Sequence, residues 1–318
     1  MRAIKMCKGG GGLASLRRPL AEACRGAAED RGFIIVAVLW ILGLLAALVS
    51  IYAVYVANAA LSLGVNDNRL QAEALTSAAL ELVAYQLTAA DEKSRATHGD
   101  FTLRMGRAGL AVGFRSEAAR IDLNAAPKPL LAGLFAALGA DYSQAEYYAD
   151  RIVGWRGKSQ NAALNDEADA YRTAGLSYAP RQGPFASVGE LWLVLGLPPA
   201  LVERALPFVT VFSGLPTVNI MDASPEVVAA LPGMSADRLY AILSQRASGA
   251  QNAEFVLSLA GPARTSATAE GGKASRVSVA VGFDNGRRVT AEAVILPQAD
   301  GDKPFRILYW RDDFDGPA

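Results

Sequence analysis

Apolar residues dominate the chain from Phe33 onward, and no Asp, Glu, Lys, Arg or His occurs between Phe33 and Asn66. About 20 apolar residues, each rising 1.5 Å, suffice to cross the hydrocarbon core of a bilayer. The preceding segment, residues 1–32, carries seven basic and three acidic residues. Because basic flanks stay in the cytoplasm, the pattern predicts one membrane-spanning helix with a cytoplasmic N-terminus and a translocated C-terminal part.

A helical period continues beyond the apolar run. Apolar residues recur every three to four positions, among them Leu75, Ala79 and Leu82. Polar residues such as Glu73, Ser77 and Glu81 recur with the same spacing between them. This spacing predicts that the helix extends over residues 33–90, with an amphipathic second half that packs one face on the rest of the protein.

Short strands and then helices follow. Residues 101–105 and 110–115 predict a hairpin with a Gly-containing turn, and residues 121–124 a third extended run. Helical patterns cover residues 126–139, 143–155, 187–195 and 199–206, whereas the polar residues 157–183 predict a loop. We therefore assign residues 91–123 to the first part of an α+β head and residues 124–216 to an inserted α-helical domain.

The last third returns to strands. Helices are predicted over residues 237–246 and 253–259, followed by a mobile loop at 260–273. Two alternating runs flank Asn285-Gly286, which is a strong hairpin signal, and residues 305–311 predict a final strand. Residues 217–318 are thus predicted to complete the head. The expected fold class is α+β, a long N-terminal helix on a small antiparallel sheet with a large helical insertion.

A short pattern occurs twice. The segment Ile121-Asp-Leu-Asn-Ala-Ala-Pro aligns without gaps on Val218-Asn-Ile-Met-Asp-Ala-Ser, 97 residues later, and an apolar helix follows each copy. Both copies predict an extended run, a turn and a helix. Two copies of so short a pattern are compatible with a duplication and equally with shared local physics.

Composition narrows the function. The sequence has 318 residues, 52% of them hydrophobic, with 31 basic and 31 acidic side chains. Beyond residue 32 there are 24 basic and 28 acidic residues, a net charge of −4, which argues against a general nucleic-acid binder. Both cysteines, Cys7 and Cys24, precede residue 33, and His98 is the only histidine. The part beyond residue 32 therefore lacks the cysteines for a disulfide or a cysteine zinc site, and one histidine leaves little basis for a Ser-His-Asp triad. We interpret His98 as a solvated loop residue.

Three interpretations of the N-terminal segment compete. It is a plain signal anchor, or a cleaved signal peptide ending near Ala57-Asn58-Ala59, although its apolar run is long for the latter. In the third interpretation, Gly32-Phe33 resembles the processing site of type IV prepilins and pseudopilins, where residues 1–32 would be a leader removed on the cytoplasmic side. Those proteins mostly carry Glu at the fifth mature position, which is Ala37 here. A subunit at the end of a fibre has no neighbouring amine for such a Glu to meet, so Ala37 favours an end position.

Four features together resemble the minor pseudopilin K family of the type II secretion system (general secretion pathway protein K). They are Gly32-Phe33 with Ala37, Ile121-Asp-Leu-Asn-Ala-Ala before a Leu-rich helix, Pro184-Phe-Ala-Ser-Val-Gly-Glu-Leu-Trp-Leu-Val-Leu-Gly, and Val218-Asn-Ile-Met-Asp-Ala-Ser-Pro. The resemblance covers residues 32–309. It implies a pilin-like fold with a large helical domain inserted in the head.

The resemblance also implies a role and partners. It implies a non-enzymatic minor pseudopilin in the bacterial inner membrane, with a periplasmic head, that primes the pseudopilus from its tip and supports export across the outer membrane. The expected partners are other minor pseudopilins, the major pseudopilin, the prepilin peptidase, the inner-membrane assembly platform, secreted substrates or the secretin, and the lipid bilayer. It further implies calcium as a structural cofactor in the inserted domain, for which the best local ligands are Asp166, Glu167 and Asp169.

Two other function classes remain open. The repeated pattern also resembles helix-hairpin-helix DNA-binding modules, with Leu231-Pro-Gly-Met-Ser near their hairpin, but Ser235 stands where a second glycine is expected. A signal-anchored periplasmic enzyme is the second alternative. Carboxylates such as Asp150 and Glu190 are present, but their spacing defines no acid/base pair, and we assign no catalytic residue.

Overall fold

The computed structural model describes residues 29–89, 95–157, 165–248, 252–298 and 304–314, except for the side chains of residues 29–32, 59–68 and 165–166. The chain forms two units, which divide after Asn68. Helix α1 (Glu29–Ala89) has 61 residues, so the predicted N-terminal helix is confirmed. The first unit holds the apolar run of α1, and the second holds everything from Arg69 onward.

The second unit contains a five-stranded antiparallel sheet with the strand order β1-β2-β7-β8-β9. Both predicted hairpins form. Gly106 and Gly286 have φ values of 60° and 84°, a left-handed conformation that glycine adopts without steric cost. The strands are β1 (His98–Met105), β2 (Ala108–Ser116), β7 (Ser275–Gly282), β8 (Arg288–Pro297) and β9 (Phe305–Asp312).

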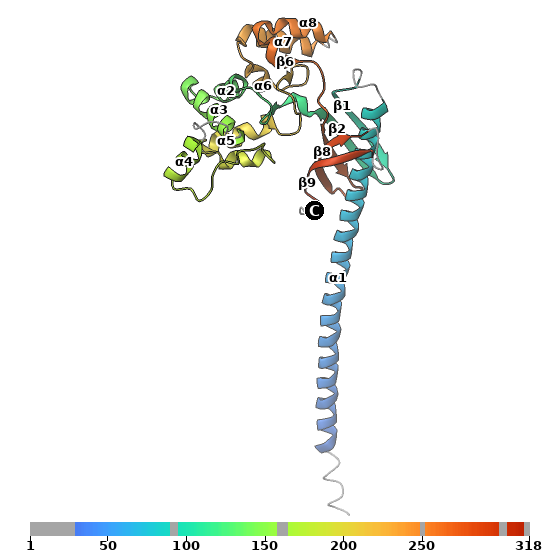
Figure 1. The fold of residues 1–318 in the computed structure, drawn as a ribbon. Helices are drawn as coiled ribbons and strands as arrows, with labels where there is room; N and C mark the ends of the chain where they lie inside the picture. The colour runs from blue at the N-terminus through green and yellow to red at the C-terminus, as the bar shows by residue number, and fades with distance from the viewer. Residues whose placement is uncertain (1–28, 90–94, 158–164, 249–251, 299–303, 315–318) are drawn as a thin grey trace, which may run out of the picture. The chain divides into compact units, whose positions relative to one another are not determined.

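The amphipathic second half of α1 packs on one face of this sheet (Figure 1). Its buried residues recur every three to four positions, as the sequence predicts. They meet alternate residues of the strands, because neighbouring side chains of a strand point to opposite faces. From α1 the cluster includes Ala72, Leu75, Ala79, Leu80, Val83, Ala84 and Leu87, and from β2, β7 and β8 it includes Leu110, Val112, Phe114, Val277, Val279, Val281, Val289 and Ala291.

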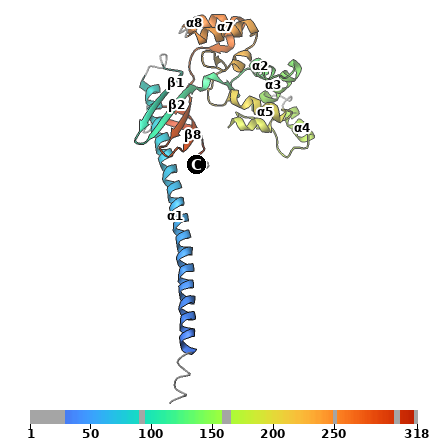
Figure 2. The ribbon, with the colours of Figure 1, turned by 180° about the vertical axis from the view of Figure 1, so that it is seen from behind.

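A helical region is inserted between β2 and β7 (Figure 2). Its buried apolar residues form a core of their own, separate from that of the sheet. Its first part is η1 (Glu117–Ala119), β3 (Ile121–Asp122), α2 (Lys128–Ala137), α3 (Tyr142–Arg156), α4 (Asn165–Thr173), η3 (Val188–Leu193), α5 (Pro199–Ala205), η4 (Leu206–Phe208) and β4 (Val209–Thr210). Its second part is β5 (Val218–Asn219), α6 (Pro225–Ala229), α7 (Ala236–Ala247), α8 (Ala253–Leu259), η5 (Gly261–Ser266) and β6 (Ala267–Thr268).

The structure of the helical region corrects three predictions. Buried residues from Ile121 to Ala263 form one cluster, so the helices after residue 217 belong to the inserted region and the predicted boundary at residue 216 is too early. The segment 260–273, predicted as a mobile loop, contains η5 and β6. The predicted loop at 157–183 contains α4. In each case tertiary packing supplies order that the small or polar residues do not encode locally.

The repeated sequence pattern corresponds to a structural repeat. In the first copy β3 pairs in parallel with β4, and in the second copy β5 pairs in parallel with β6. Each first strand is followed by the same turn. The side-chain oxygens of Asp122 and Asn219 accept hydrogen bonds from the amides of Asn124 and Met221, two residues on, at 2.7 and 2.9 Å. Such Asx turns explain why Asp or Asn is required at this position.

An arginine near the end of the second helix completes each copy. Arg156 of α3 donates to the carbonyl of Ala126 at 2.6 Å, and Arg246 of α7 donates to the carbonyl of Ala223 at 2.8 Å. Ala126 and Ala223 are equivalent in the 97-residue alignment. Burial lowers the pKa of both guanidiniums, which is the expected effect of withdrawing a cation from water. The shared interaction favours duplication over coincidence.

The two copies meet at equivalent positions. Gly133 of α2 lies against Ala230, its counterpart 97 residues later, and a Cβ at Gly133 would stand 1.9 Å from the carbonyl oxygen of Ala230. A contact between equivalent residues is what a local two-fold relation between the copies produces. Only glycine allows this approach of α2 to the end of α6.

We predict that Gly133→Ala lowers the free energy of unfolding of the helical region by about 3 kcal/mol, because the added methyl group meets a backbone atom that cannot turn aside. Urea unfolding of the detergent-solubilised chain, followed by tryptophan fluorescence, measures this. Gly109→Ala is the matched control, since no atom lies within 4 Å of its new Cβ. Equal stability of the two variants would contradict the close approach.

Candidate functional site

The apolar part of α1 is a candidate membrane anchor. Residues Phe33–Asn58 form a 26-residue stretch with a mean hydropathy of 2.9, and it is the one stretch of this kind among the described residues. Its large side chains lie exposed, including Phe33 and Trp40 at 75% and 76%. An apolar surface of this extent is stable in a lipid environment or against other apolar helices.

The predicted processing residues lie at the start of this helix. Gly32 and Phe33 fall within α1, which begins at Glu29, and Ala37 follows about one turn later. Cleavage between Gly32 and Phe33 stays a prediction. The interpretation that Ala37 favours a position at the end of a fibre also stays a prediction.

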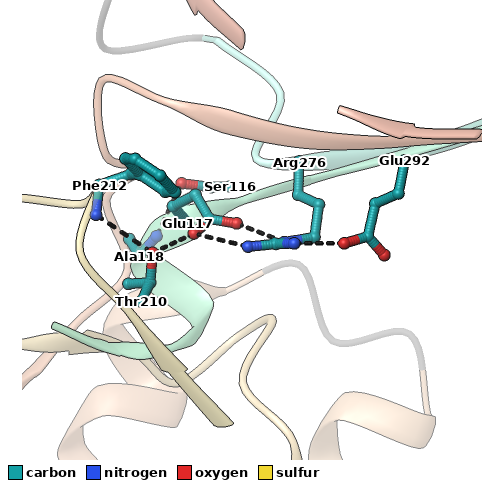
Figure 3. Close-up of polar contacts among 7 residues, drawn as sticks. All are labelled: Ser116, Glu117, Ala118, Thr210, Phe212, Arg276 and Glu292. Atoms are coloured by element: carbon teal, nitrogen blue, oxygen red, sulfur yellow. Dashed lines mark hydrogen bonds and ion pairs between the residues drawn. The ribbon is translucent and has the colours of Figure 1, made fainter. Parts of the chain in front are cut away.

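A buried ion pair joins the helical region to the sheet. The Glu117 side chain, on η1 directly after β2, is 1% exposed. Its Oε1 accepts a hydrogen bond from Arg276 Nε of β7 at 2.7 Å, and its Oε2 accepts one from Arg276 Nη2 at 3.3 Å. Thr210 Oγ1 of β4 donates to the same Oε2 (Figure 3). One carboxylate thus links the sheet with both ends of the first repeat.

A second carboxylate completes the network. Arg276 Nη1 donates to Glu292 Oε1 on β8 (Figure 3). The Arg276 guanidinium also lies 5.6 Å from the ring centroid of Tyr309. Burial by itself would lower the pKa of Arg276, but the charges and hydrogen bonds of Glu117 and Glu292 outweigh it and raise the pKa. The arginine is therefore firmly charged at the point where the helical region leaves the sheet.

Backbone contacts reinforce this junction. Ser116, the last residue of β2, is the N-cap of η1, and its Oγ accepts hydrogen bonds from the amides of Ala118 and Gly272 at 3.2 and 2.8 Å. The amide of Glu117 donates to the carbonyl of Ala274 at 3.0 Å. The chain thus enters and leaves the helical region side by side.

The single histidine forms a separate link between the sheet and the helical region. His98 begins β1, and its Nδ1 lies 2.7 Å from Oδ1 of Asp222, in the turn before α6. The His98 side chain is 61% exposed and that of Asp222 is 1% exposed. His98 is solvated, as predicted, but it begins β1 rather than lying in a loop, and one ring nitrogen contacts a buried carboxylate.

The predicted calcium ligands do not converge within the described residues. Glu167 pairs with Arg151 at 2.9 Å, and Asp169 pairs with Arg172 at 2.8 Å. Residues two apart on a helix face different sides, so Glu167 and Asp169 do not fit one ion in this arrangement. The Asp166 side chain lies outside the described residues. Calcium stays a prediction, and a rise in melting temperature with calcium but not magnesium would support it.

Comparison with known proteins finds a family match for part of the chain. Residues 114–214 match the family model described as type II secretion system (T2SS), protein K. The matched region, about a third of the chain, is similar to that family of type II secretion proteins. The match runs from the end of β2 through the first repeat and therefore includes Glu117 and Thr210, whereas Arg276 lies beyond it.

A solved structure supports the fold. A chain in the crystal structure of the GspK-GspI-GspJ complex from the enterotoxigenic Escherichia coli type 2 secretion system is similar, with a TM-score of 0.55 and 16% sequence identity. The similarity covers 77% of this chain and 96% of that chain. No curated protein sequence matches. At this identity the likeness establishes the α+β fold with its helical insertion, and the family match concerns residues 114–214.

The sequence did not predict a role for the junction residues Glu117, Arg276 and Glu292. Glu117 follows an alternating strand in a polar-looking stretch, and Arg276 and Glu292 occupy outward positions of their strands. The hairpin register around Asn285-Gly286 could have placed Arg276 near Glu292. Nothing local indicated that Glu117 would be buried beside them.

We predict that Glu117→Gln lowers the free energy of unfolding by about 3 kcal/mol, because it leaves a buried arginine with one carboxylate in place of two. Urea unfolding of the full chain in detergent measures this. Glu254→Gln is the control: Glu254 pairs with Arg264 at 3.0 Å, but its side chain is 77% exposed, so its loss should cost less than about 1 kcal/mol. A similar loss of unfolding free energy in both variants would show that the buried Glu117–Arg276 pair stabilises the protein no more than an exposed pair does.

Proposed function

We propose that the chain is a non-enzymatic, single-pass minor pseudopilin that stands at the tip of the type II secretion pseudopilus. There it primes assembly and supports protein export across the outer membrane, with its N-terminus in the cytoplasm and its head in the periplasm. The observation that carries the proposal is the insertion of a duplicated helical region between two neighbouring strands of an otherwise small head. A slim subunit packs on all sides within a fibre, whereas an insertion of this bulk is easiest to place at an end.

Partners follow from the same reasoning. The similar solved chain is part of a complex named GspK-GspI-GspJ. By analogy, other minor pseudopilins are the proposed tip partners of this chain. The major pseudopilin, the prepilin peptidase and the assembly platform are further proposed partners. Secreted substrates and the secretin are proposed as additional contacts.

The buried carboxylates favour a structural role over catalysis. Asp122 accepts hydrogen bonds from the Asn124 and Gly214 amides, both at 2.7 Å, as well as from Ser213 Oγ at 3.1 Å. Glu117 is bound by Arg276 and Thr210 as described above. A general acid or base must reach a substrate proton, and carboxylates committed to turns and ion pairs do not.

The helix-hairpin-helix alternative has weaker support. Within the hairpin the Met234 amide donates to the carbonyl of Leu231 at 3.0 Å, and Arg238 Nη1 donates to the carbonyl of Gly233 at 3.3 Å. That amide is engaged within the chain, whereas phosphate binding needs free amides. The net charge of −4 beyond residue 32 points the same way.

We predict that the protein extracted from membranes containing its native prepilin peptidase begins at Phe33. The leader is then lost on the cytoplasmic side while the apolar helix is kept. Intact mass and N-terminal sequencing measure this, and Gly32→Leu should give the uncleaved chain. A start near Ala60 would indicate an exported soluble protein, and an intact Met1 would indicate a plain signal anchor. Either result would contradict processing of the chain as a pseudopilin.

We further predict that Ala37→Glu impairs pseudopilus priming and secretion in cells. A carboxylate in the bilayer costs about 2.5–3.5 kcal/mol unless a cation meets it, and a tip subunit has no subunit beyond it to supply one. Secreted activity in the medium is the measurement. Ala37→Gln is the control, since it has the same length without the charge. Unchanged secretion by Ala37→Glu would remove the argument for an end position.

A further inference from the structure

Strand β1 forms one edge of the five-stranded sheet, so one side of its backbone meets no other strand among the described residues. Just before β1, the amide of Ser116 donates to the carbonyl of Thr97 at 2.6 Å. Hydrogen-bonded positions alternate along an antiparallel pair, so the odd-numbered residues of β1 bond to β2. The even-numbered residues Asp100, Thr102 and Arg104 therefore point their N–H and C=O groups away from the sheet, and all three are exposed.

The opposite edge of the sheet is irregular, whereas β1 is not. At β9 the register shifts between Val294 and Ile295 of β8, which leaves Leu308 of β9 without an opposite residue. Such a bulge hinders the addition of a further strand. The register of β1 with β2 is unbroken over eight residues, and the strand contains no proline. The β1 edge thus keeps the regular geometry with which another strand can pair.

The side chains of β1 define what fits beside them. Phe101 and Leu103 face the α1 side of the sheet, where they are only partly buried against its core. An added strand with apolar residues opposite them would complete this cover, because directly opposite side chains share a face. Asp100 and Arg104 stand on the other face. The added strand therefore needs a base opposite Asp100 and an acid opposite Arg104.

Strand β2 does not match these two charges. Asp100 stands opposite Gly113, and Arg104 stands opposite Gly109, in the register of the hairpin. Arg104 also lies 3.8 Å from Asp284, but both side chains are exposed, and such pairs contribute little. Edges that are protected by charge repel an incoming strand, most often with lysines. One acid and one base instead admit a strand whose charges follow the complementary order.

We propose that residues 100–104 of β1 bind an extended segment of another protein, which adds to the sheet as an antiparallel strand. Read from its N-terminus, this segment carries an acid, an apolar residue, a small polar residue, a second apolar residue and a base. Main-chain hydrogen bonds supply the affinity of such strand addition, and the alternating side chains supply its selectivity. Antiparallel pairing matches the rest of the sheet, in which every pair is antiparallel.

A second copy of the chain is the wrong partner, although β1 is locally its own complement. In an antiparallel pair of two β1 strands, Asp100 of each copy would face Arg104 of the other. The two-fold axis of that pair stands perpendicular to the sheet and gives the α1 helices of the two copies opposite directions. Two copies that enter one bilayer through α1 point the same way, so they cannot form this pair. The exclusion of a second copy rests on the proposed membrane anchoring, whereas strand addition itself does not.

The first experiment measures hydrogen exchange of the full chain in non-ionic detergent, read by mass spectrometry at single residues. The probe is the peptide Thr-Glu-Val-Thr-Val-Lys-Thr, capped at both ends. At about 5 mM it should slow exchange at the amides of Asp100, Thr102 and Arg104 about fivefold. The amides of Phe101 and Leu103 already bond to β2, so they should change far less.

Two matched controls test the cause of this protection. A peptide with Glu in place of its Lys puts an acid opposite Asp100 and should give less than about half the protection. Thr102→Pro removes an outward N–H and should abolish protection at Asp100 and Arg104, whereas Thr102→Ala keeps that N–H and should retain the protection. Proline is tolerated at an edge where its nitrogen faces solvent, so the Thr102→Pro fold should persist.

The second experiment locates the partner. The same exchange is measured on the complex extracted in mild detergent from membranes that contain the complete secretion system. Protection of the even-numbered amides there supports a partner within that complex. Its absence, with the peptide effect present, supports a partner outside the complex, such as a secreted protein.

Three results would overturn the proposal. The first is the absence of alternating protection from both the peptide and the complex. The second is equal protection by the two peptides, or protection that survives Thr102→Pro. The third is protection of the same amides without any peptide that grows with protein concentration together with a doubled mass, which would show a second copy. The peptide measurement involves no secretion component, so a failure of the pseudopilin role does not affect it.

Discussion

The buried pair of Glu117 and Arg276 is the constraint on which the second unit depends. Residues 117–274 leave the sheet after β2 and return at β7, and Ser116 stands opposite Ser275 in the register of these strands. The insertion can be large because its two ends lie side by side, so the sheet remains continuous from β1 to β9. A charge pair hidden at this point costs desolvation, and its geometry must be good to repay it. Thr210 and Glu292 supply the additional contacts.

The duplication explains how the insertion forms a core of its own. Each copy alone is a few short helices and a pair of two-residue strands, too little to bury its apolar side. Two copies that meet at Gly133 and Ala230 share one cluster of buried residues. The arginines Arg156 and Arg246 fix the turn of each copy from within, so the same local solution is used twice.

These features fit a subunit that displays a head on a membrane helix. The apolar part of α1 is a candidate membrane anchor, and the amphipathic part packs on the sheet. The helical region then remains free to offer surfaces elsewhere.

The sequence alone determined the elements whose signal is local. Apolar length defined the membrane segment, a 3.6-residue period defined the rest of α1, and Asn285-Gly286 defined the β7–β8 hairpin. Motifs in residues 121–124, 184–196 and 218–225 were enough to indicate the family. Only the tertiary structure decided that residues 217–269 belong with the helical region, that residues 261–268 form η5 and β6, and that Glu117 is buried. The physical reason is distance along the chain: Glu117 meets Arg276 across 159 residues, and no local pattern of charge or period encodes such a contact.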